Sequence, residues 1–302
     1  MILTLGTTPA VARAMIFDRL TPDAVNRAAE VHVSAAGKAV NVARVARMMG
    51  HEVVCIGLVG GETGQTVRQN LESLGIQHSF IECAAPTRVC VTVIDRSTGQ
   101  TTELVEEAGP AGVGDEERIL ELIADLAPRS EVLVCAGTIA PNISVDFYRS
   151  AAERAKRVNP SIRVIVDAKG PALSRALLAG VIVKCNRAEI GRDDLAIAMN
   201  QALQQGAAAI IVTDGPNPTH VTDGRSTWII ASPKVNVVSP IGSGDSLAAG
   251  VAAGLERGWP IQEAARLGVA CAAVNAQSAI AGDVDRGAVE RMFQVIQLIQ
   301  KD

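Results

Sequence analysis

The chain has 302 residues, of which 48% are hydrophobic, 20% charged and 2% aromatic, and its formal net charge is −4. With neither a basic excess nor aromatic side chains for base stacking, this composition argues against a nucleic-acid-binding protein. The six cysteines are far apart and form no CxxC pair, so their spacing suggests neither a disulfide framework nor a zinc site.

No apolar run reaches the ~18–20 residues that span a bilayer, and we expect no membrane partner. The first ten residues (MILTLGTTPA) read as a strand rather than a signal peptide. Free thiols fit a reducing compartment. We therefore expect a cytoplasmic enzyme or binding protein.

Short, nearly all-apolar runs alternate with stretches whose apolar residues recur at helical spacing. Apolar runs of this kind are typical of strands covered by helices on both faces. The alternation predicts an α/β fold with a doubly wound, mostly parallel sheet. The predicted strands are residues 2–5, 53–59, 132–135, 164–166, 181–184 and 209–212, and the predicted helices are 38–49, 63–74, 116–126, 146–158 and 193–205.

Two segments interrupt this alternation. Residues 11–33 have no clear helical face, and residues 88–95 and 101–106 flank a turn at 96–100 and predict a hairpin. These pieces form either a small extra sheet that projects over the strand ends as a lid, or edge strands of the main sheet. The pattern does not decide between the two.

The last quarter of the chain is predicted to be largely helical. A strand-like run at 235–238 precedes helices at 243–256, 262–278 and 287–300. There is no internal repeat and no Pro-, Gly- or Ser-rich linker, so we expect one domain over residues 1–302.

The strongest local motif is GSGDS at residues 242–246, between the strand-like run and a helix of small residues. Two glycines at such a junction let backbone N–H groups converge, and a helix N-terminus adds positive potential, so the motif predicts an anion site suited to phosphate. Asp245 is then either a base that takes a proton from an attacking hydroxyl or a helix cap.

Other nucleotide and metal motifs are absent. The Gly37-Lys38-Ala39 run lacks the upstream glycine and the Ser/Thr of a Walker loop, and residues 242–244 lack the third glycine of a dinucleotide fingerprint. The four histidines do not cluster, which argues against a histidine metal site.

Beyond these local patterns, the whole chain resembles the ribokinase-like, or PfkB-type, sugar kinases, and is most similar to their tagatose-6-phosphate kinase and 1-phosphofructokinase branch. Two signatures stand in the family order, AGKAVNVAR at 36–44 and GSGDS at 242–246. Further matching segments are MILTL at 1–5, VNR at 25–27, TRVC at 87–90, TEL at 102–104, GP at 109–110, KCNRAE at 184–189 and VNAQ at 274–277.

The resemblance implies that the γ-phosphoryl group of ATP passes to a sugar hydroxyl. It assigns Asp245 as the base, the backbone of Gly242, Ser243 and Gly244 as an anion hole, and Asn186 and Glu189 as the pair that organises Mg²⁺ through water. The remaining matches are substrate-side residues (Gly37, Lys38 and Asn41), arginines for a sugar phosphate (Arg27 and Arg88), and nucleotide-side residues (Thr213, Gly215 and Asn275).

The resemblance also implies a β lid formed by about residues 9–36 and 87–109, and a homodimer through that lid. The expected substrates are ATP and a phosphorylated ketohexose, of the fructose 1-phosphate, fructose 6-phosphate or tagatose 6-phosphate type.

The sugar end and the nucleotide loop depart from the family pattern. Ala12 stands where the family has an Asp that holds sugar hydroxyls, and Pro218 stands where the nucleotide loop has a glycine. Proline restricts φ and removes an N–H, so the loop is expected to differ in shape. Two alternatives therefore stay open: a kinase of an unphosphorylated sugar or nucleoside, and a catalytically weak sugar- or nucleotide-binding regulatory protein.

Overall fold

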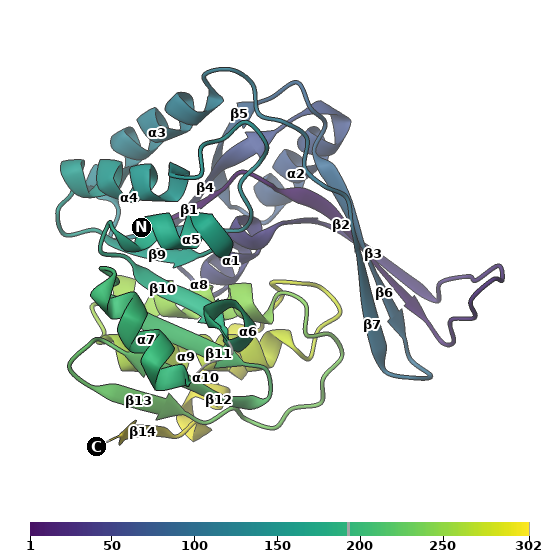
Figure 1. The fold of residues 1–302 in the computed structure, drawn as a ribbon. Coiled ribbons are helices and arrows are strands. Elements are labelled where there is room, and N and C mark those ends of the chain that lie inside the picture. Colours follow the sequence, from purple (N-terminus) through teal and green to yellow (C-terminus); the bar gives the residue numbers. More distant parts are fainter. Residues whose placement is uncertain (192–193, 302) are drawn as a thin grey trace.

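The computed structural model describes residues 1–191 and 194–301 as two β-sheets with helices around the larger one (Figure 1). The large sheet has ten strands in the order β14-β13-β12-β11-β10-β9-β8-β1-β4-β5. Its strands are β1 (Ile2–Gly6), β4 (Val53–Val59), β5 (Gln77–Glu82), β8 (Val132–Ala136), β9 (Arg163–Asp167), β10 (Ile182–Asn186), β11 (Ala209–Asp214), β12 (Asn217–Thr222), β13 (Thr227–Ile230) and β14 (Leu298–Lys301).

The seven neighbouring strands β11, β10, β9, β8, β1, β4 and β5 pair in parallel, and β12, β13 and β14 extend that sheet antiparallel at one edge. The predicted doubly wound, mostly parallel sheet is therefore confirmed. All six predicted strands are present in it. Their apolar side chains are buried on both faces, which is why they read as continuous apolar runs rather than alternating ones.

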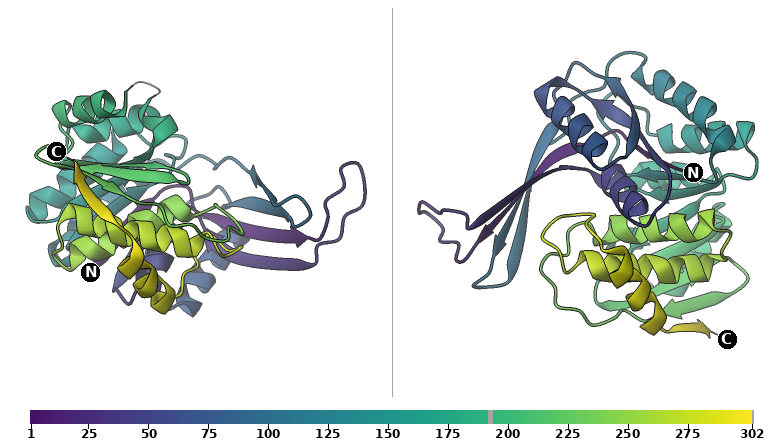
Figure 2. Two further views of the ribbon diagram at one scale, coloured as in Figure 1. Left: turned by 90° about the horizontal axis from the view of Figure 1, so that it is seen from below. Right: turned by 180° about the vertical axis from the view of Figure 1, so that it is seen from behind.

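Helices cover both faces of the large sheet (Figure 2). One face packs against α1 (Lys38–Met48), α2 (Gly61–Ser73), α8 (Ser243–Glu256), α9 (Ile261–Asn275) and α10 (Arg286–Val295). The other packs against α3 (Asp115–Leu126), α4 (Phe147–Val158), α5 (Gly170–Leu177) and α7 (Leu195–Gln204), and the short α6 (Arg187–Ile190) follows β10. A 3₁₀ turn (Ala127–Arg129) ends α3.

Helices α8 and α9 lie unusually close together because both carry glycine at the contact. A Cβ built on Gly250 would lie 2.6 Å from Gly268 Cα, and one built on Gly268 would lie 2.6 Å from Leu247 O. The small-residue helix after the GSGDS motif is thus explained by packing.

The small sheet projects from the body of the protein (Figures 1 and 2) and has the order β3-β2-β6-β7. It consists of β2 (Ala10–Phe17), β3 (Glu30–Ala36), β6 (Arg88–Asp95) and β7 (Gln100–Val105). Of the two sequence interpretations, a separate sheet is the one observed, and the predicted hairpin is its β6–β7 pair.

Two sequence predictions at the C-terminal end are wrong. Residues 235–238 form no strand: the Val238 N–H donates to Ala276 O (2.8 Å) at the end of α9, and the Val237 side chain is 58% exposed. The helix predicted at 287–300 ends at Val295, because the following residues pair with the open edge of β13 as β14.

Other boundaries moved by a few residues. The helix predicted at 193–205 is α7, and its predicted first residue, Asp193, lies outside the described residues. Within the described part of the chain, no helix has both the length and the apolar character needed to cross a membrane.

Candidate active site

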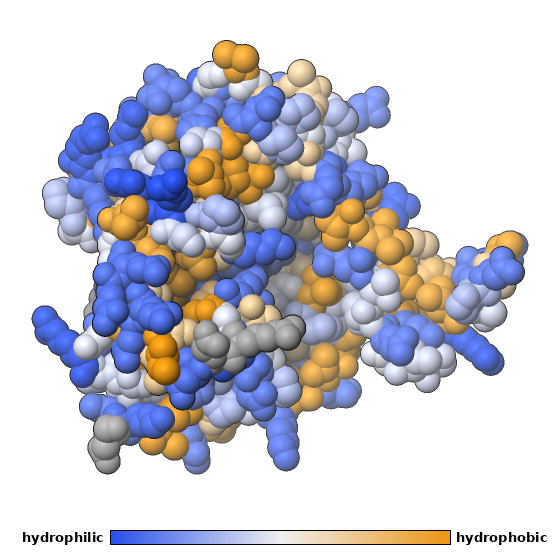
Figure 3. Space-filling model, in the orientation of Figure 1, coloured by the Kyte–Doolittle hydropathy of each residue, from blue (hydrophilic) through white to orange (hydrophobic). Residues whose placement is uncertain are grey.

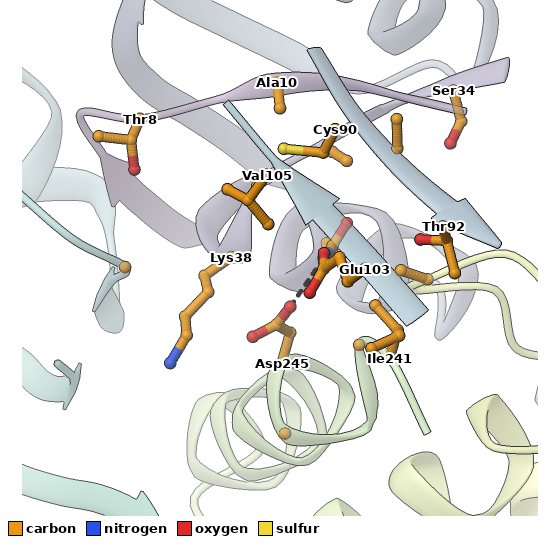
Figure 4. A pocket seen from close by; sticks show the side chains of 18 of the residues that line it. Thr8, Ala10, Ser34, Lys38, Cys90, Thr92, Glu103, Val105, Ile241 and Asp245 are labelled. Carbon is orange, nitrogen blue, oxygen red and sulfur yellow. Dashed lines mark hydrogen bonds between the residues drawn. The ribbon is translucent and has the colours of Figure 1, made fainter. Parts of the chain in front are cut away.

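A cavity of about 520 Å³ opens between the small sheet and the carboxyl ends of β8, β9 and β10. Its lining combines residues that are far apart in the chain, from the small sheet, the N-terminus of α1 and the N-terminus of α8. Figure 4 shows Asp245 at the start of α8, facing the strands that carry Cys90 and Glu103. In an open α/β sheet, this edge is where ligands bind.

The GSGDS motif forms the first turn of α8 at the floor of the cavity. Gly242 has φ +80°, and a Cβ there would lie 2.8–2.9 Å from Ala281 and Gly282, so only glycine fits this backbone. The first N–H groups of a helix have no partner within it and carry its positive end. Gly242 and Gly244 line the cavity, so their backbone is placed to meet an anion.

The backbone N–H of Ser243, expected to be part of the anion hole, has a partner within the protein. Its N–H already donates to Pro240 O (3.2 Å), and its hydroxyl accepts from Asn275 Nδ2 (3.2 Å). Ser243 therefore closes the turn rather than facing the cavity.

Asn275 also has a different position from the one expected at the adenine. Its side chain is fully buried behind the loop, where Nδ2 donates to Ile241 O (2.9 Å) and Oδ1 accepts from Gly282 N–H (2.7 Å). It joins the two loops that meet at Gly242, because it bonds to the backbone of Ile241 in one and of Gly282 in the other.

Asp245 is 7% exposed, and its Oδ2 accepts a hydrogen bond from Asn41 Nδ2 (2.7 Å). Burial and the nearby negative charge of Asp167 together raise the pKa of Asp245 to about 6, against the lowering effects of Lys38, Asn41 and Lys184. A carboxyl with a pKa just below neutrality can accept a proton and later return it.

A buried carboxylate joins two lysines beside Asp245. Asp167 is fully buried at the end of β9, where Oδ1 accepts from Lys38 Nζ (2.7 Å) and Oδ2 from Lys184 Nζ (2.8 Å). Burial on its own raises the pKa of Asp167, but the two ammonium groups outweigh it and hold that pKa below its usual value. Both lysines line the cavity.

Asp167 and Lys184 were not singled out in the sequence as site residues. Asp167 is the last residue of β9, after Val166, and Lys184 is in the middle of β10, after Val183. A charged residue directly after an apolar run, toward the carboxyl end of a parallel strand, is the signal that could have identified both.

The small sheet supplies one of the two expected arginines. Arg88 lines the cavity, and its Nη1 and Nη2 donate to Glu106 O and Thr8 O (3.1 Å each). Arg27 is exposed in the connection between β2 and β3 and is not among the cavity residues. A single chain therefore does not bring Arg27 to the site.

The strand that carries Ala12 presents small side chains to the cavity. Ala10, Ala12 and Ala14 alternate along β2 on the cavity side, and Ala12 pairs with Ser34 and Cys90 on the neighbouring strands. Gly37 has φ +102°, and a Cβ there would lie 2.9 Å from Pro9 Cα, so the first turn of α1 can approach the start of β2 only with glycine.

On the other side of the cavity, Asn186 and Glu189 form a capping box at the start of α6. Asn186 Oδ1 accepts from the Glu189 N–H, and Glu189 Oε2 accepts from the Asn186 N–H, both at 2.9 Å. Asn186 lines the cavity. Of the expected nucleotide-side residues, Thr213 lies in β11 and Gly215 in the turn between β11 and β12. Neither is among the cavity residues, and Pro218 is within β12.

Comparison with known proteins gives consistent results. Residues 3–285 match the model of the pfkB family carbohydrate kinases. The tagatose-6-phosphate kinase of Staphylococcus epidermidis is 27% identical over 313 residues, with 99% of this chain and 100% of that protein covered.

Solved structures agree along the full length. A putative phosphofructokinase from Staphylococcus aureus is 25% identical with a TM-score of 0.83, and covers 100% of this chain and 99% of its own. A possible 1-phosphofructokinase from Thermotoga maritima is 19% identical with a TM-score of 0.89 and full coverage of both chains, which shows that the fold is the same.

Proposed function

The chain belongs to the pfkB family of carbohydrate kinases, and from this premise we propose that it transfers the γ-phosphoryl group of ATP to a hydroxyl of a phosphorylated ketohexose. The observation that carries the proposal is that one cavity is lined by a buried carboxylate, a glycine turn at a helix N-terminus and an arginine from the small sheet. Asp245 and the Gly242–Gly244 turn lie at its floor, and Arg88 lies at its other side. The tagatose-6-phosphate kinase relative supports the substrate class.

The reaction follows from this geometry. Asp245 takes the proton of the acceptor hydroxyl while the oxygen of that hydroxyl bonds to the γ-phosphorus of ATP. The bond between the γ-phosphorus and the bridging oxygen breaks, and that oxygen leaves with ADP. The backbone of Gly242 and Gly244 and the ammonium groups of Lys38 and Lys184 face the negative charge on the transferred group. Preorganised donors of this kind are worth roughly 10²–10³ in rate.

Arg88 is assigned to the phosphate that the sugar already carries. Two of its nitrogens are held by backbone carbonyls, while its Nε is buried without a partner among the described residues. The guanidinium is therefore fixed in place before substrate arrives. Fixed donors bind a phosphate at a smaller entropic cost than a mobile side chain.

The residues present fit a magnesium ion that keeps most of its water. Within the described part of the chain, no cluster of three or more His, Cys, Asp or Glu side chains could hold a metal, and Glu189 already uses one carboxylate oxygen in the capping box. Asn186 and Glu189 would reach the ion through water, with phosphate oxygens as its direct ligands. When bound, the ion neutralises charge on the phosphates.

The small sheet is proposed to act as a lid and a dimer interface. The side of it opposite the cavity exposes Val31, Val33 and Leu104 by 48%, 49% and 57%, and Figure 3 shows apolar side chains along this projecting part. An exposed apolar sheet face is stabilised by a partner, here a second copy of the chain. In such a dimer, Arg27 of one chain could reach the cavity of the other chain.

The dimer is tested by sedimentation of Val33→Lys, with Val113→Lys as the matched control, since Val113 is fully exposed elsewhere. We expect dimers for the control and monomers for Val33→Lys. A monomeric wild type would refute the lid dimer.

The position of Arg27 favours a second candidate, a kinase of an unphosphorylated sugar or nucleoside, which needs fewer arginines. An ADP-release assay with ATP and Mg²⁺ decides between the candidates, with fructose 1-phosphate, fructose 6-phosphate, tagatose 6-phosphate, fructose, ribose and adenosine as acceptors. Asp245→Asn serves as the blank. Turnover of one phosphosugar supports the proposal. Turnover of an unphosphorylated acceptor alone supports the second candidate, and ATP binding without any turnover favours a binding-only protein.

A further inference from the structure

We propose that Asp167 is a positioning residue for phosphoryl transfer, whose two carboxylate oxygens hold the ammonium groups of Lys38 and Lys184 against the anion site at the start of α8. The inference rests on the proposed kinase function. Asp167 is fully buried and is not among the cavity residues, so it acts through the two lysines rather than on the substrate.

Lys184 is placed directly against the anion site. A Cβ built on Gly244 would lie 2.7 Å from Lys184 Nζ, so the ammonium group touches the first turn of α8. That turn carries the positive end of the helix, which repels a cation. The hydrogen bond to Asp167 Oδ2 (2.8 Å) is the contact that keeps Lys184 there when no anion is bound.

Lys38 reaches the same point from the other side. It is the first residue of α1, its side chain is 38% exposed, and its ammonium binds Asp167 Oδ1 (2.7 Å). Burial lowers the pKa of Lys38, but Asp167 and Asp245 outweigh this effect and the pKa is raised. A long lysine side chain loses much conformational freedom when it is held in this way, and Asp167 provides that restraint before the substrate binds.

A second consequence concerns Asp245, whose charge is influenced by Asp167. The ionisable groups nearest to Asp245 are Lys38 from α1, Asp167 from β9 and Lys184 from β10. Other ionisable residues line the same cavity: His32, Arg88, Glu103, Glu107 and Lys169. The charge of Glu189 raises the pKa of Lys38, and Tyr148 lies near Asp167. Removing the negative charge of Asp167 lowers the pKa of Asp245, and removing the positive charge of Lys184 raises it.

These opposite signs define the experiment. The full-length protein is compared with Asp167→Asn, Lys184→Gln and the double variant. Asp115→Asn is the matched control, because Asp115 is a 4% exposed carboxylate that pairs with Arg118 away from the cavity. The readouts are kcat and KM, the pH dependence of kcat, and the titration of the Asp245 carboxyl carbon by NMR, assigned with Asp245→Asn.

We expect Asp167→Asn to lower kcat by ~10²-fold and to move the acid limb of the kcat profile to lower pH. Lys184→Gln moves the limb to higher pH, and the double variant returns it toward the wild-type position. The control leaves the limb in place. If Asp167→Asn alone fails to fold, the double variant, which removes both charges of the buried pair, is compared with Lys184→Gln, and the limb should lie at lower pH in the double variant.

The inference is overturned if the Asp245 titration stays in place in Asp167→Asn, or if the loss of kcat only matches the loss of folded protein measured by circular dichroism. The NMR titration needs no turnover. If the wild type phosphorylates none of the acceptors, but the Asp245 titration still shifts in Asp167→Asn and Lys184→Gln as described, the proposed function is refuted and the electrostatic role of Asp167 stands.

Discussion

The raised pKa of Asp245 has a consequence for stability that can be worked out in advance. The carboxyl has a pKa of about 6 in the folded protein against 3.8 for an ordinary Asp. The folded state therefore binds this proton more tightly than the unfolded chain. The stability contributed by Asp245 is complete below pH ~4, falls as the pH rises toward 6, and is constant above that.

Each pH unit between the two pKa values corresponds to ~1.4 kcal/mol, so ionising Asp245 costs the folded state about 3 kcal/mol at neutral pH. Asp245→Asn removes this cost because an amide does not ionise. Between pH 4.5 and pH 8, the free energy of unfolding of the variant relative to the wild type should rise by about 2 kcal/mol. Titrating groups that do not interact with Asp245 cancel in this comparison.

The assay is urea unfolding of both proteins at several pH values, combined with kcat at pH 8. We expect the stability of Asp245→Asn relative to the wild type to rise with pH, while its kcat is lower by at least ~10²-fold. A buried catalytic carboxylate produces both effects, because the charge that catalysis requires also destabilises the folded state. Parallel stability curves for the two proteins would refute the raised pKa. Near-normal turnover would refute the role of Asp245 as the base.

Four further substitutions test the rest of the site and the helix packing beneath it. Arg88→Ala should raise KM for the phosphorylated acceptor ~10-fold and leave KM for ATP unchanged in steady-state assays, and equal effects on both would contradict its assignment. Gly242→Ala should destabilise the protein by at least ~1 kcal/mol and lower kcat, because φ is +80° and the added methyl meets Ala281. Gly250→Ala, at the α8–α9 contact, should destabilise without lowering kcat per folded molecule. Asn275→Ala should lower kcat and leave KM for ATP near the wild-type value, whereas a raised KM for ATP would indicate a direct contact with the nucleotide.

Much of the fold was predictable because it follows from local chemistry. Buried parallel strands need continuous apolar runs, and the runs at 53–59 and 132–135 could satisfy no other environment so well. The GSGDS motif likewise predicted a helix start at Ser243. The structure has α8 begin there, and the positive φ of Gly242 explains why a glycine precedes it. The family resemblance placed Asp245 and Arg88, and the cavity brings these two residues together.

The remainder depended on which segments meet in three dimensions. Residues 235–238 have strand-like chemistry but form no strand, and Val238 bonds to the end of α9 instead, whereas residues 298–301 pair with β13. Asn275 lies in the VNAQ segment that resembles the family, yet its side chain is buried and bonds to the backbone of two loops.

Asp167, Lys38 and Lys184 are separated in the chain, and only the sheet order and the position of α1 bring their charges within hydrogen-bond distance. Sequence by itself determined the elements and the chemical groups available. The tertiary structure decided which of those groups share a cavity, because charge, burial and pKa depend on neighbours that local patterns do not specify.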